Sequence, residues 1–412
     1  MPETLFVTGS SGFIGSKLLN RLKNHSYEPV YCLYRNPDHL EKRVGTNSHL
    51  KLVPGDLCDK ESYTSYLTSS DTVIHLAAAT GKAPREEYSQ INANGTQVLI
   101  DECKKAGVKN FLYISTIAAK YKDKTRYYYA QSKEAGEEAV KNSGLGYAIV
   151  RPTIVIGDDS TIWKNLAGLS KGFIIPVFGD GKNLIQPIHV EDLVSCIVSI
   201  LDENLFGGKT FEIGGADIVT FEDFLSTIHL EYSKSKPRFL HIPFSPLKKI
   251  LSFFERYFYS VLPVTVGQLS AFNNDGVIQA NDLHERHVAE MKSVKDMVSI
   301  VVRDEIKQAH YHQLEHESVT FTKFLINDEP TNYIQNNYCK AHHSSNIFVG
   351  NIDDQFDDFL IKFSARNGFF TKLADSYASF FYKNSLLRKK IVLLLAILES
   401  SAPSYPFAFV DA

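Results

Sequence analysis

The stretch Thr8-Gly9-Ser10-Ser11-Gly12-Phe13-Ile14-Gly15 decides the fold of this chain. An apolar run, Leu5–Thr8, leads into it and a helical pattern follows it, so its three glycines fall at a strand-to-helix turn. In such a turn the first glycine allows the tight bend, the second lets the backbone approach a pyrophosphate, and the third lets the helix pack closely on the strand. The start of the helix adds N–H groups and the positive end of its dipole. The stretch therefore predicts a dinucleotide-binding loop.

Short apolar runs and longer helical patterns alternate through the first 150 residues. Alternation of this kind predicts a parallel sheet with helices on both faces. We expect an α/β protein with a Rossmann-type, doubly wound parallel sheet. The predicted strands are Leu5–Thr8, Pro29–Tyr34, Leu50–Val53, Thr72–Leu76, Phe111–Ser115 and Tyr147–Val150. The predicted helices are Ile14–Asn24, Ser62–Leu67, Tyr88–Ala106 and Tyr129–Asn142.

These patterns predict that the chain has three segments. Residues 1–150 are expected to form the dinucleotide-binding core. Residues 151–300 are expected to complete the sheet and to form a smaller substrate-binding part, with one helix at Val190–Leu201. Within them, Phe239–Leu262 is rich in aromatic residues and predicts an amphipathic helix, which leaves a peripheral membrane contact open. Residues 301–412 predict a mostly helical C-terminal extension of unknown role, with a helix near Leu386–Leu398.

Composition limits which binding partners and which cellular compartment we expect. Lys and Arg number 44 against 47 Asp and Glu, so a net charge of −3 gives no reason to expect nucleic acid or an acidic membrane as the main partner. Five scattered cysteines without a CxxC pair favour reduced thiols, and the N-terminus lacks a signal-peptide pattern. The late apolar run Ile391–Leu398 is far short of the roughly 20 residues that cross a bilayer. We expect a cytoplasmic protein without transmembrane segments, and a homodimer stays open.

The end of the second predicted strand indicates which cofactor the loop would take. An acidic residue there would hold the ribose hydroxyls of NAD, whereas an arginine suits the extra phosphate of NADP. The chain reads Leu33-Tyr34-Arg35-Asn36, so Arg35 favours NADP(H), with NAD and a merely solvated arginine as the alternatives. After the third strand, Gly55-Asp56-Leu57 places Asp56 where it could accept from the adenine amino group, or act as an ordinary turn residue.

A candidate acid/base pair lies in Tyr129-Ala130-Gln131-Ser132-Lys133, where a phenol and an ammonium share one helix face. A free tyrosine has a pKa near 10, and a nearby lysine cation favours the phenolate and lowers that pKa. The pair would then make Tyr129 a usable acid/base. A hydroxyl from Ser115-Thr116, at the end of the fifth strand, could hold the reacting oxygen beside the phenol.

Taken together, these motifs resemble a known family. They are residues 8–15, Gly55-Asp56-Leu57, His75-Leu76-Ala77-Ala78-Ala79, Asn92 in N-A-N-G-T, Tyr129–Lys133 and Arg151-Pro152-Thr153. In this order they resemble the extended short-chain dehydrogenase/reductase superfamily, in its NAD-dependent epimerase/dehydratase-like group. The resemblance covers roughly residues 4–300. It implies a Rossmann fold with a smaller substrate-binding part built mainly from residues after 150.

The resemblance also implies roles for individual residues. Tyr129 would be the acid/base, and Lys133 would bind the nicotinamide ribose and lower the pKa of Tyr129. Thr116 would orient the substrate oxygen, ahead of Ser115, and Asn92 would be a structural or relay residue. The residues expected to hold the cofactor are Gly9, Ser11, Gly12, Phe13, Ile14, Gly15, Arg35, Asp56, Leu57, Ala77, Ala78, Tyr129, Lys133 and Pro152.

The substrate class stays divided between two branches of the family. Arg151–Gly157 departs from the R-Y-F-N-x-x-G segment of sugar epimerases and looks more like the dihydroflavonol reductase and hydroxysteroid dehydrogenase branches. However, Phe178–Gly181 followed by Gln186–Asp192 also recurs among nucleotide-sugar enzymes. We expect an NAD(P)-dependent oxidoreductase that reduces a carbonyl or oxidises a secondary alcohol. The alternatives are a nucleotide-sugar epimerase or dehydratase and a non-catalytic nucleotide-binding scaffold.

Other polar groups are not assigned to the site. The basic run between Lys120 and Arg126 is expected to be a solvated loop, while Lys82 and Arg85 are better placed to steer an anionic substrate, because ligands bind at the carboxyl ends of parallel strands. A histidine cluster near the C-terminus lacks a second paired-ligand motif, so no metal site is predicted. Its members are His310, His312 and His316, with Cys339, His342 and His343 further on.

Overall fold

The computed structural model of the 412-residue chain describes residues 3–44, 49–258, 265–271, 274–306, 347–349 and 408–410. The chain divides into two compact units, Met1–Arg303 and Asp304–Ala412. In the second unit, β14 (Ile347–Val349) and β15 (Ala408–Val410) form a parallel pair. The predicted helix near Leu386–Leu398 and the histidine cluster that starts at His310 lie outside the described residues.

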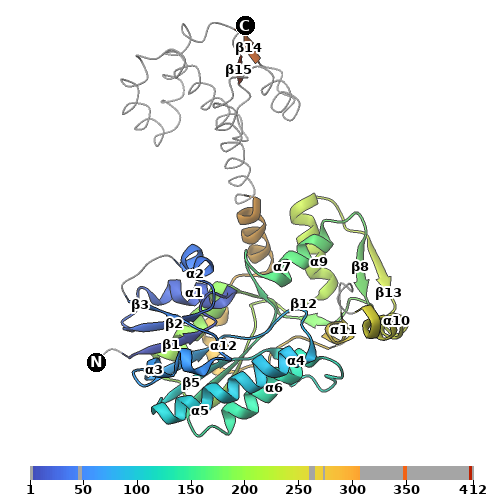
Figure 1. The fold of residues 1–412 in the computed structure, drawn as a ribbon. Coiled ribbons are helices and arrows are strands. Elements are labelled where there is room, and N and C mark those ends of the chain that lie inside the picture. The colour runs from blue at the N-terminus through green and yellow to red at the C-terminus, as the bar shows by residue number, and fades with distance from the viewer. Residues whose placement is uncertain are drawn as a thin grey trace, which may run out of the picture. The chain divides into compact units, whose positions relative to one another are not determined.

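The first unit is built on a seven-stranded sheet in the order β11-β6-β5-β4-β1-β2-β3, in which every pairing is parallel (Figure 1). The chain reverses direction across the sheet between β1 and β4, which is where doubly wound sheets bind nucleotides. This confirms the predicted Rossmann-type sheet. The strands are β1 (Leu5–Thr8), β2 (Val30–Tyr34), β3 (Leu50–Pro54), β4 (Thr72–His75), β5 (Asn110–Ile114), β6 (Gly146–Pro152) and β11 (Gly207–Ile213).

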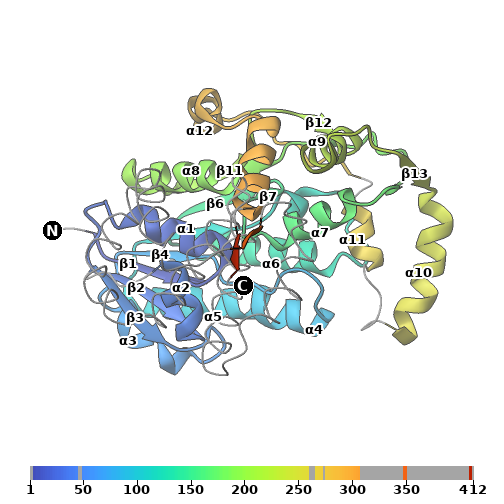
Figure 2. The same cartoon turned by 90° about the horizontal axis from the view of Figure 1, so that it is seen from above.

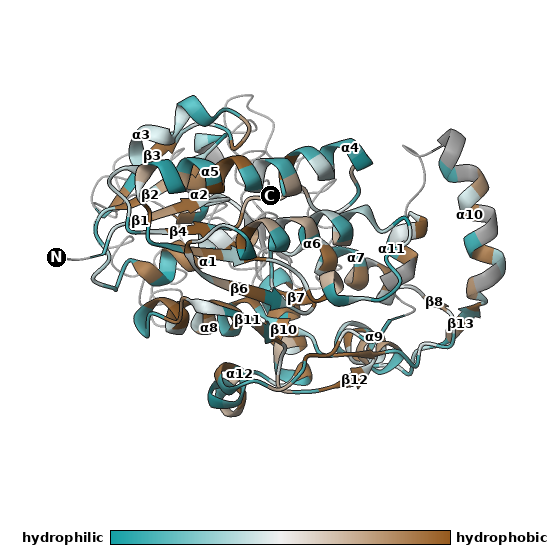
Figure 3. Cartoon of the chain, turned by 90° about the horizontal axis from the view of Figure 1, so that it is seen from below, coloured by the Kyte–Doolittle hydropathy of each residue, from teal (hydrophilic) through white to brown (hydrophobic). Residues whose placement is uncertain are grey.

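Helices cover both faces of this sheet, and each face has its own apolar core (Figures 1 and 2). One core joins the sheet to α1 (Phe13–Leu22), α2 (Pro37–Val44) and α8 (Val190–Asp202). The other joins it to α3 (Thr64–Leu67), α5 (Thr96–Ala106) and α6 (Tyr128–Lys141). Figure 3 shows the resulting pattern, with apolar strands such as β1 and β2 between helices that turn polar faces outward.

The predicted helix Tyr88–Ala106 is not a uniform α-helix. It is made of α4 (Arg85–Tyr88), a π-helical segment η2 (Ser89–Gly95) and α5. Segments of π-helix are rare and are often found at functional sites. Here η2 carries the buried Asn92 at its centre.

A third apolar core, centred on Trp163 and Phe224, holds together the part of the unit that follows β6. It contains residues of α7 (Thr161–Ser170), β8 (Ile175–Phe178), α9 (Phe221–Ser233) and the helical stretch from Val294 to Val302. The prediction of one helix over Phe239–Leu262 was wrong at its start. Residues Phe239–Ile242 form β13 because they pair with β8, and α10 (Phe244–Phe258) begins only after Pro243.

Short elements complete the unit. They are η1 (Lys60–Ser62), η3 (Ile117–Lys120), η4 (Val288–Glu290), α11 (Val266–Ala271), α12 (Asp282–His287), and the strand pairs β7 (Val155–Ile156) with β10 (Ile188–His189) and β9 (Leu184–Ile185) with β12 (Val219–Thr220). Within the described part of the chain, no helix has the length and apolar character needed to cross a membrane.

Candidate functional site

The glycine loop between β1 and α1 has the geometry that its sequence predicts. Gly9 adopts a left-handed φ of +69°, and a Cβ there would lie 2.6 Å from the backbone nitrogen of Ala77 at the end of β4. A Cβ on Gly15 would overlap the carbonyl oxygen of Gly9. The N-cap of α1 is Gly12, and no side chain caps it. The N–H groups of the first turn of α1, at Phe13 and Ile14, are therefore suited to receive a phosphate, as a dinucleotide requires.

Two of the predicted cofactor-binding residues face each other at the ends of β2 and β3. The Arg35 guanidinium lies 3.8 Å from the Asp56 carboxylate, and both side chains are well exposed. Asp56 also accepts a hydrogen bond from the backbone nitrogen of Cys58 at 2.8 Å, so it orders the turn after β3. Leu57 is buried beside it. An exposed pair of this kind is weak, so Arg35 can exchange Asp56 for an anionic ligand at little cost.

Arg43, on α2, is a candidate site residue that was not predicted from the sequence. Its guanidinium donates to the carbonyl oxygen of Ser11 in the glycine loop at 2.9 Å and lies 3.5 Å from the carboxylate of Asp159. A second arginine thus stands directly against the phosphate loop. Its signal in the sequence was weak, because Arg43 lies far along the chain from the loop and in a polar helix.

At the end of β4, Ala77 and Ala78 line the carboxyl edge of the sheet next to the glycine loop. The backbone nitrogen of Ala77 donates to the hydroxyl of Thr8 at 3.2 Å. Asn92 fixes the backbone of Ala79, since its side chain accepts a hydrogen bond from the Ala79 nitrogen at 2.7 Å and donates one to the Ala79 oxygen at 3.0 Å. The same amide donates to the hydroxyl of Ser132 at 3.0 Å. Asn92 therefore ties the end of β4 to the helix that carries Tyr129 and Lys133.

Thr116 and Tyr129 form the pair on which acid/base chemistry would depend. The Thr116 hydroxyl lies near the Tyr129 phenol and acts to lower the pKa of that phenol. Ser115 is engaged elsewhere, because its hydroxyl donates to Glu137 at 2.6 Å and is buried. The geometry thus favours Thr116 over Ser115 as the residue beside the reacting oxygen.

The electrostatic state of this pair differs from the one that the sequence suggested. The pKa of Tyr129 is raised to about 12, first by burial and then by Tyr88. Lys133 does not account for any lowering, since its ammonium lies 4.1 Å from the centre of the Tyr113 ring and is almost wholly buried. Burial lowers the pKa of Lys133 itself to about 7, against a smaller opposing effect of Glu137.

The surroundings of Tyr129 are aromatic and apolar. The rings of Tyr88 and Tyr127 lie 5.9 and 6.2 Å from it, centre to centre. The hydroxyl of Tyr88 donates to the carbonyl oxygen of Gly81 and accepts from the nitrogen of Ala83. Tyr88 thereby fixes the loop after β4, the loop that also carries Lys82. Arg85 lies over the ring of Tyr128 at 5.2 Å, which places one cation at this edge.

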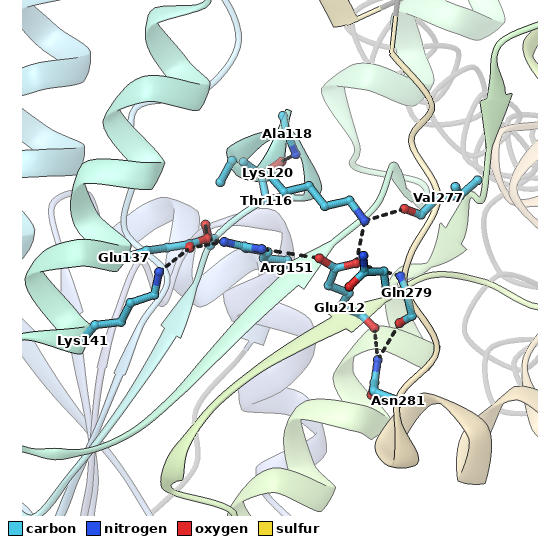
Figure 4. A network of polar contacts seen from close by, with 12 residues as sticks. Thr116, Ala118, Lys120, Glu137, Lys141, Arg151, Glu212, Val277, Gln279 and Asn281 are labelled. Carbon is cyan, nitrogen blue, oxygen red and sulfur yellow. Dashed lines mark hydrogen bonds and ion pairs between the residues drawn. The ribbon is translucent and has the colours of Figure 1, made fainter. Parts of the chain in front are cut away.

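A buried ionic network, which the sequence did not reveal, supports the helix of Tyr129 and Lys133 (Figure 4). Glu137 on α6 accepts from the Arg151 guanidinium at 2.5 and 2.8 Å, and Arg151 on β6 lies 3.4 Å from Glu212 on β11. Glu212 in turn accepts from Lys120 at 2.6 Å and from the nitrogen of Gln279 at 2.8 Å. The network thus joins α6, β6, β11 and η3 to the segment between α11 and α12.

These contacts correct one sequence interpretation, that of a solvated basic run between Lys120 and Arg126. Lys120 is not a solvated loop residue, since it binds Glu212, and Lys124 binds Glu134 at 2.8 Å.

In the Gln186–Asp192 segment, three polar side chains make contacts that stabilise the fold. The Gln186 amide donates to the Gly215 oxygen at 2.8 Å, His189 accepts from the first turn of α8, and Asp192 binds Lys292 at 2.7 Å. These side chains therefore do not single out a nucleotide-sugar substrate. Pro152, at the end of β6, is buried.

Comparison with known proteins gives one family model and several distant relatives. The model for the NAD dependent epimerase/dehydratase family matches residues 5–214. The uncharacterized protein y4nG of Sinorhizobium fredii is 28% identical over 263 residues, which are 59% of this chain and 64% of that protein. Subunit 9 of the NADH dehydrogenase (ubiquinone) 1 alpha subcomplex, mitochondrial, of Arabidopsis thaliana is 26% identical, over 66% of this chain and 68% of its own. The ceramide reductase of Caulobacter vibrioides is 26% identical, over 58% of this chain and 73% of its own.

Solved structures share the fold. The crystal structure of gox2253 has a TM-score of 0.59 at 19% identity, and the match covers 73% of this chain and 97% of that one. The terminal R domain from the myxalamid PKS-NRPS pathway has a TM-score of 0.58 at 19% identity, covering 75% and 91%. The chain spans 64% of the length of y4nG, slightly less than two thirds.

Proposed function

Because this chain belongs to the NAD dependent epimerase/dehydratase family, we propose that it is an NADP(H)-preferring oxidoreductase that reduces a carbonyl or oxidises a secondary alcohol. The observation that carries the proposal is the placement of Tyr129 one helical turn before the buried Lys133 on α6, with the Thr116 hydroxyl near the phenol. A phenol placed beside a second hydroxyl is suited to exchange a proton with a substrate oxygen.

The cofactor would be held by residues whose arrangement supports such a ligand. The glycine loop with the uncapped start of α1 suits a pyrophosphate, and Arg35 and Arg43 suit the phosphate that distinguishes NADP from NAD. Asp56, Leu57, Ala77, Ala78 and Pro152 are proposed to line the rest of the cofactor site. A bound nicotinamide would supply or accept the hydride.

We propose that the chain acts in the reductive direction. A pKa of about 12 keeps Tyr129 protonated at neutral pH, which is the form that donates a proton to a carbonyl oxygen. Thr116 would hold the same oxygen and so orient it toward the phenol. Lys133, with a pKa lowered to about 7, would regain a stable positive charge once anionic or polar groups of a ligand approach it.

The location of the substrate site and the chemical class of the substrate are also proposals. We place the substrate among residues 151–300, beside the aromatic group of Tyr88, Tyr127 and Tyr129. An apolar carbonyl compound fits this group, and the ceramide reductase among the relatives supports testing lipid carbonyls first. A nucleotide-sugar epimerase is the second candidate, supported by the family description alone.

The decisive experiment measures whether reduced cofactor is consumed. The full chain would be incubated with NADPH and a panel of lipid ketones, and oxidation of NADPH followed by absorbance. We expect net consumption that depends on the ketone and disappears in Tyr129→Phe. Interconversion of nucleotide sugars without net NADPH consumption would instead establish the epimerase. If neither activity is found while the cofactor still binds, the chain would be a nucleotide-binding subunit. That role is compatible with the similarity to subunit 9 of the NADH dehydrogenase 1 alpha subcomplex.

We also propose that the protein is cytoplasmic and can form a homodimer. Cell fractionation would test the location, in particular because one relative is named as mitochondrial. Light scattering of the purified full chain would test the dimer.

A further inference from the structure

We propose that the surface formed by residues 171–174, 234–238 and the outer face of β13 docks the protein onto an anionic lipid bilayer. We call this surface the Phe173 patch. It belongs to the part of the unit around α7, α9, β8 and β13 (Figure 1) and shares no residue with the cofactor site. The proposal does not rest on the proposed function, because lipid binding is measured without turnover.

The apolar part of the patch is made of three exposed side chains. Phe173 is 73% exposed, Ile174 is 51% exposed and Leu240 is 55% exposed. Phe173 and Ile174 precede β8, in the loop after α7, whereas Ile175 and Val177 of the strand itself are buried in the core around Trp163. Leu240 pairs in register with Pro176, which lies on the face of β8 opposite to Ile175 and Val177. Single exposed apolar residues need no explanation, but three in adjacent segments do.

Contacts between the two loops show that the patch is continuous. The nitrogen of Ile175 donates to the carbonyl oxygen of Arg238 at 2.8 Å, and the Arg238 guanidinium lies 4.6 Å from the centre of the Phe173 ring. On the α9 side, the ring of His229 bonds to the carbonyl oxygen of Ser170 at 2.7 Å. The ends of α7 and α9 and the starts of β8 and β13 therefore form one surface.

Exposed cations lie in the same two segments as these apolar side chains. Lys171, Lys234, Lys236 and Arg238 are all exposed. Glu231 provides a nearby carboxylate, 3.6 Å from Lys234. This local excess of positive charge stands out in a chain whose overall net charge is −3. Aromatic and aliphatic side chains inside a ring of lysine and arginine are the combination by which surfaces enter the headgroup region of anionic membranes.

The test is cosedimentation of the full chain with vesicles of phosphatidylcholine, alone or mixed with phosphatidylserine. We expect binding to the mixed vesicles that weakens as salt is added. The double variant Lys234→Glu/Lys236→Glu should lower the partition constant by at least about tenfold, because each basic residue near an anionic surface contributes separately. The variant Phe173→Ser/Ile174→Ser should also release the protein, with a smaller change in salt dependence.

The matched control is Lys51→Glu/Lys209→Glu, which makes the same change of net charge at two other exposed lysines, on β3 and β11. It should change the partition constant by less than about twofold if binding is local to the Phe173 patch. No binding of the wild-type chain to phosphatidylserine vesicles would overturn the proposal. Equal losses in the control and in Lys234→Glu/Lys236→Glu would do so too, since binding would then follow net charge. If the Phe173→Ser/Ile174→Ser protein failed to fold, the two charge variants would still decide.

Discussion

Replacing Glu137 by alanine tests whether the buried network in Figure 4 holds the helix of Tyr129 and Lys133 in place. The Glu137 side chain is fully buried and accepts from Ser115 at 2.6 Å and from two nitrogens of Arg151 at 2.5 and 2.8 Å. Without it, the Arg151 guanidinium keeps, among the residues that the structure describes, the contact with Glu212 at 3.4 Å. Removing one partner of a buried ion pair typically costs about 3–5 kcal/mol of unfolding free energy.

Glu137→Gln should cost less, about 1–3 kcal/mol, because the amide oxygen can still accept one hydrogen bond. The assay is urea unfolding of the full chain followed by circular dichroism. Lys141→Ala is the control, since Lys141 lies 3.6 Å from Glu137 at the surface and should change stability by under about 1 kcal/mol. The double variant Glu137→Ala/Arg151→Ala should lose less than the sum of the single variants. Additive losses, or a cost below about 1 kcal/mol for Glu137→Ala, would refute the assigned role of the network.

Other predictions concern the cofactor, the pH dependence and the tail. NADPH should bind at least roughly tenfold more tightly than NADH, since a charge-assisted contact is worth about 1.5–3 kcal/mol. Arg35→Ala should reduce this difference in affinity, and equal affinities for the two cofactors in calorimetry would argue against an NADP preference. Because the pKa of Lys133 falls from 10.5 to about 7 on folding, the unfolded chain binds more protons between these values. The stability of the wild type relative to Lys133→Met should therefore rise with pH across that window, and a flat difference in thermal unfolding would exclude a buried, shifted lysine. A chain ending at Ile306 should still bind NADPH, whereas one ending at residue 300 should be less stable because it loses Val301 and Val302 from the core.

The elements that could be predicted are those whose signal is local. The glycine loop, six strands of the sheet and the helix of Tyr129 are each specified by residues within one turn or one strand of each other. From the residues alone, either Ser115 or Thr116 could lie beside Tyr129, and only the family resemblance ranks Thr116 first, so the role of Thr116 stays a prediction.

The elements that could not be predicted depend on partners distant in the sequence. Phe239–Ile242 reads equally well as helix or strand, and only pairing with β8 makes it a strand. Arg151 is part of a family motif, but its ion pairs with Glu137 and Glu212 could not be predicted, because the three residues belong to α6, β6 and β11 and lie far apart in the sequence. The pKa of Tyr129 was misjudged for a related reason, since burial depends on how Tyr88 and the neighbouring loop pack around the phenol.

The central claim is that Tyr129 transfers the proton while other residues bind the cofactor. The measurement is the rate of NADPH oxidation by Tyr129→Phe on an active carbonyl substrate, together with the affinity of the same variant for NADPH. We predict a rate lowered by at least about 10²-fold, with cofactor affinity nearly unchanged, because only the transferable proton is removed. A Tyr129→Phe protein whose rate stays within about threefold of the wild type would contradict the account and place the proton-transfer group elsewhere.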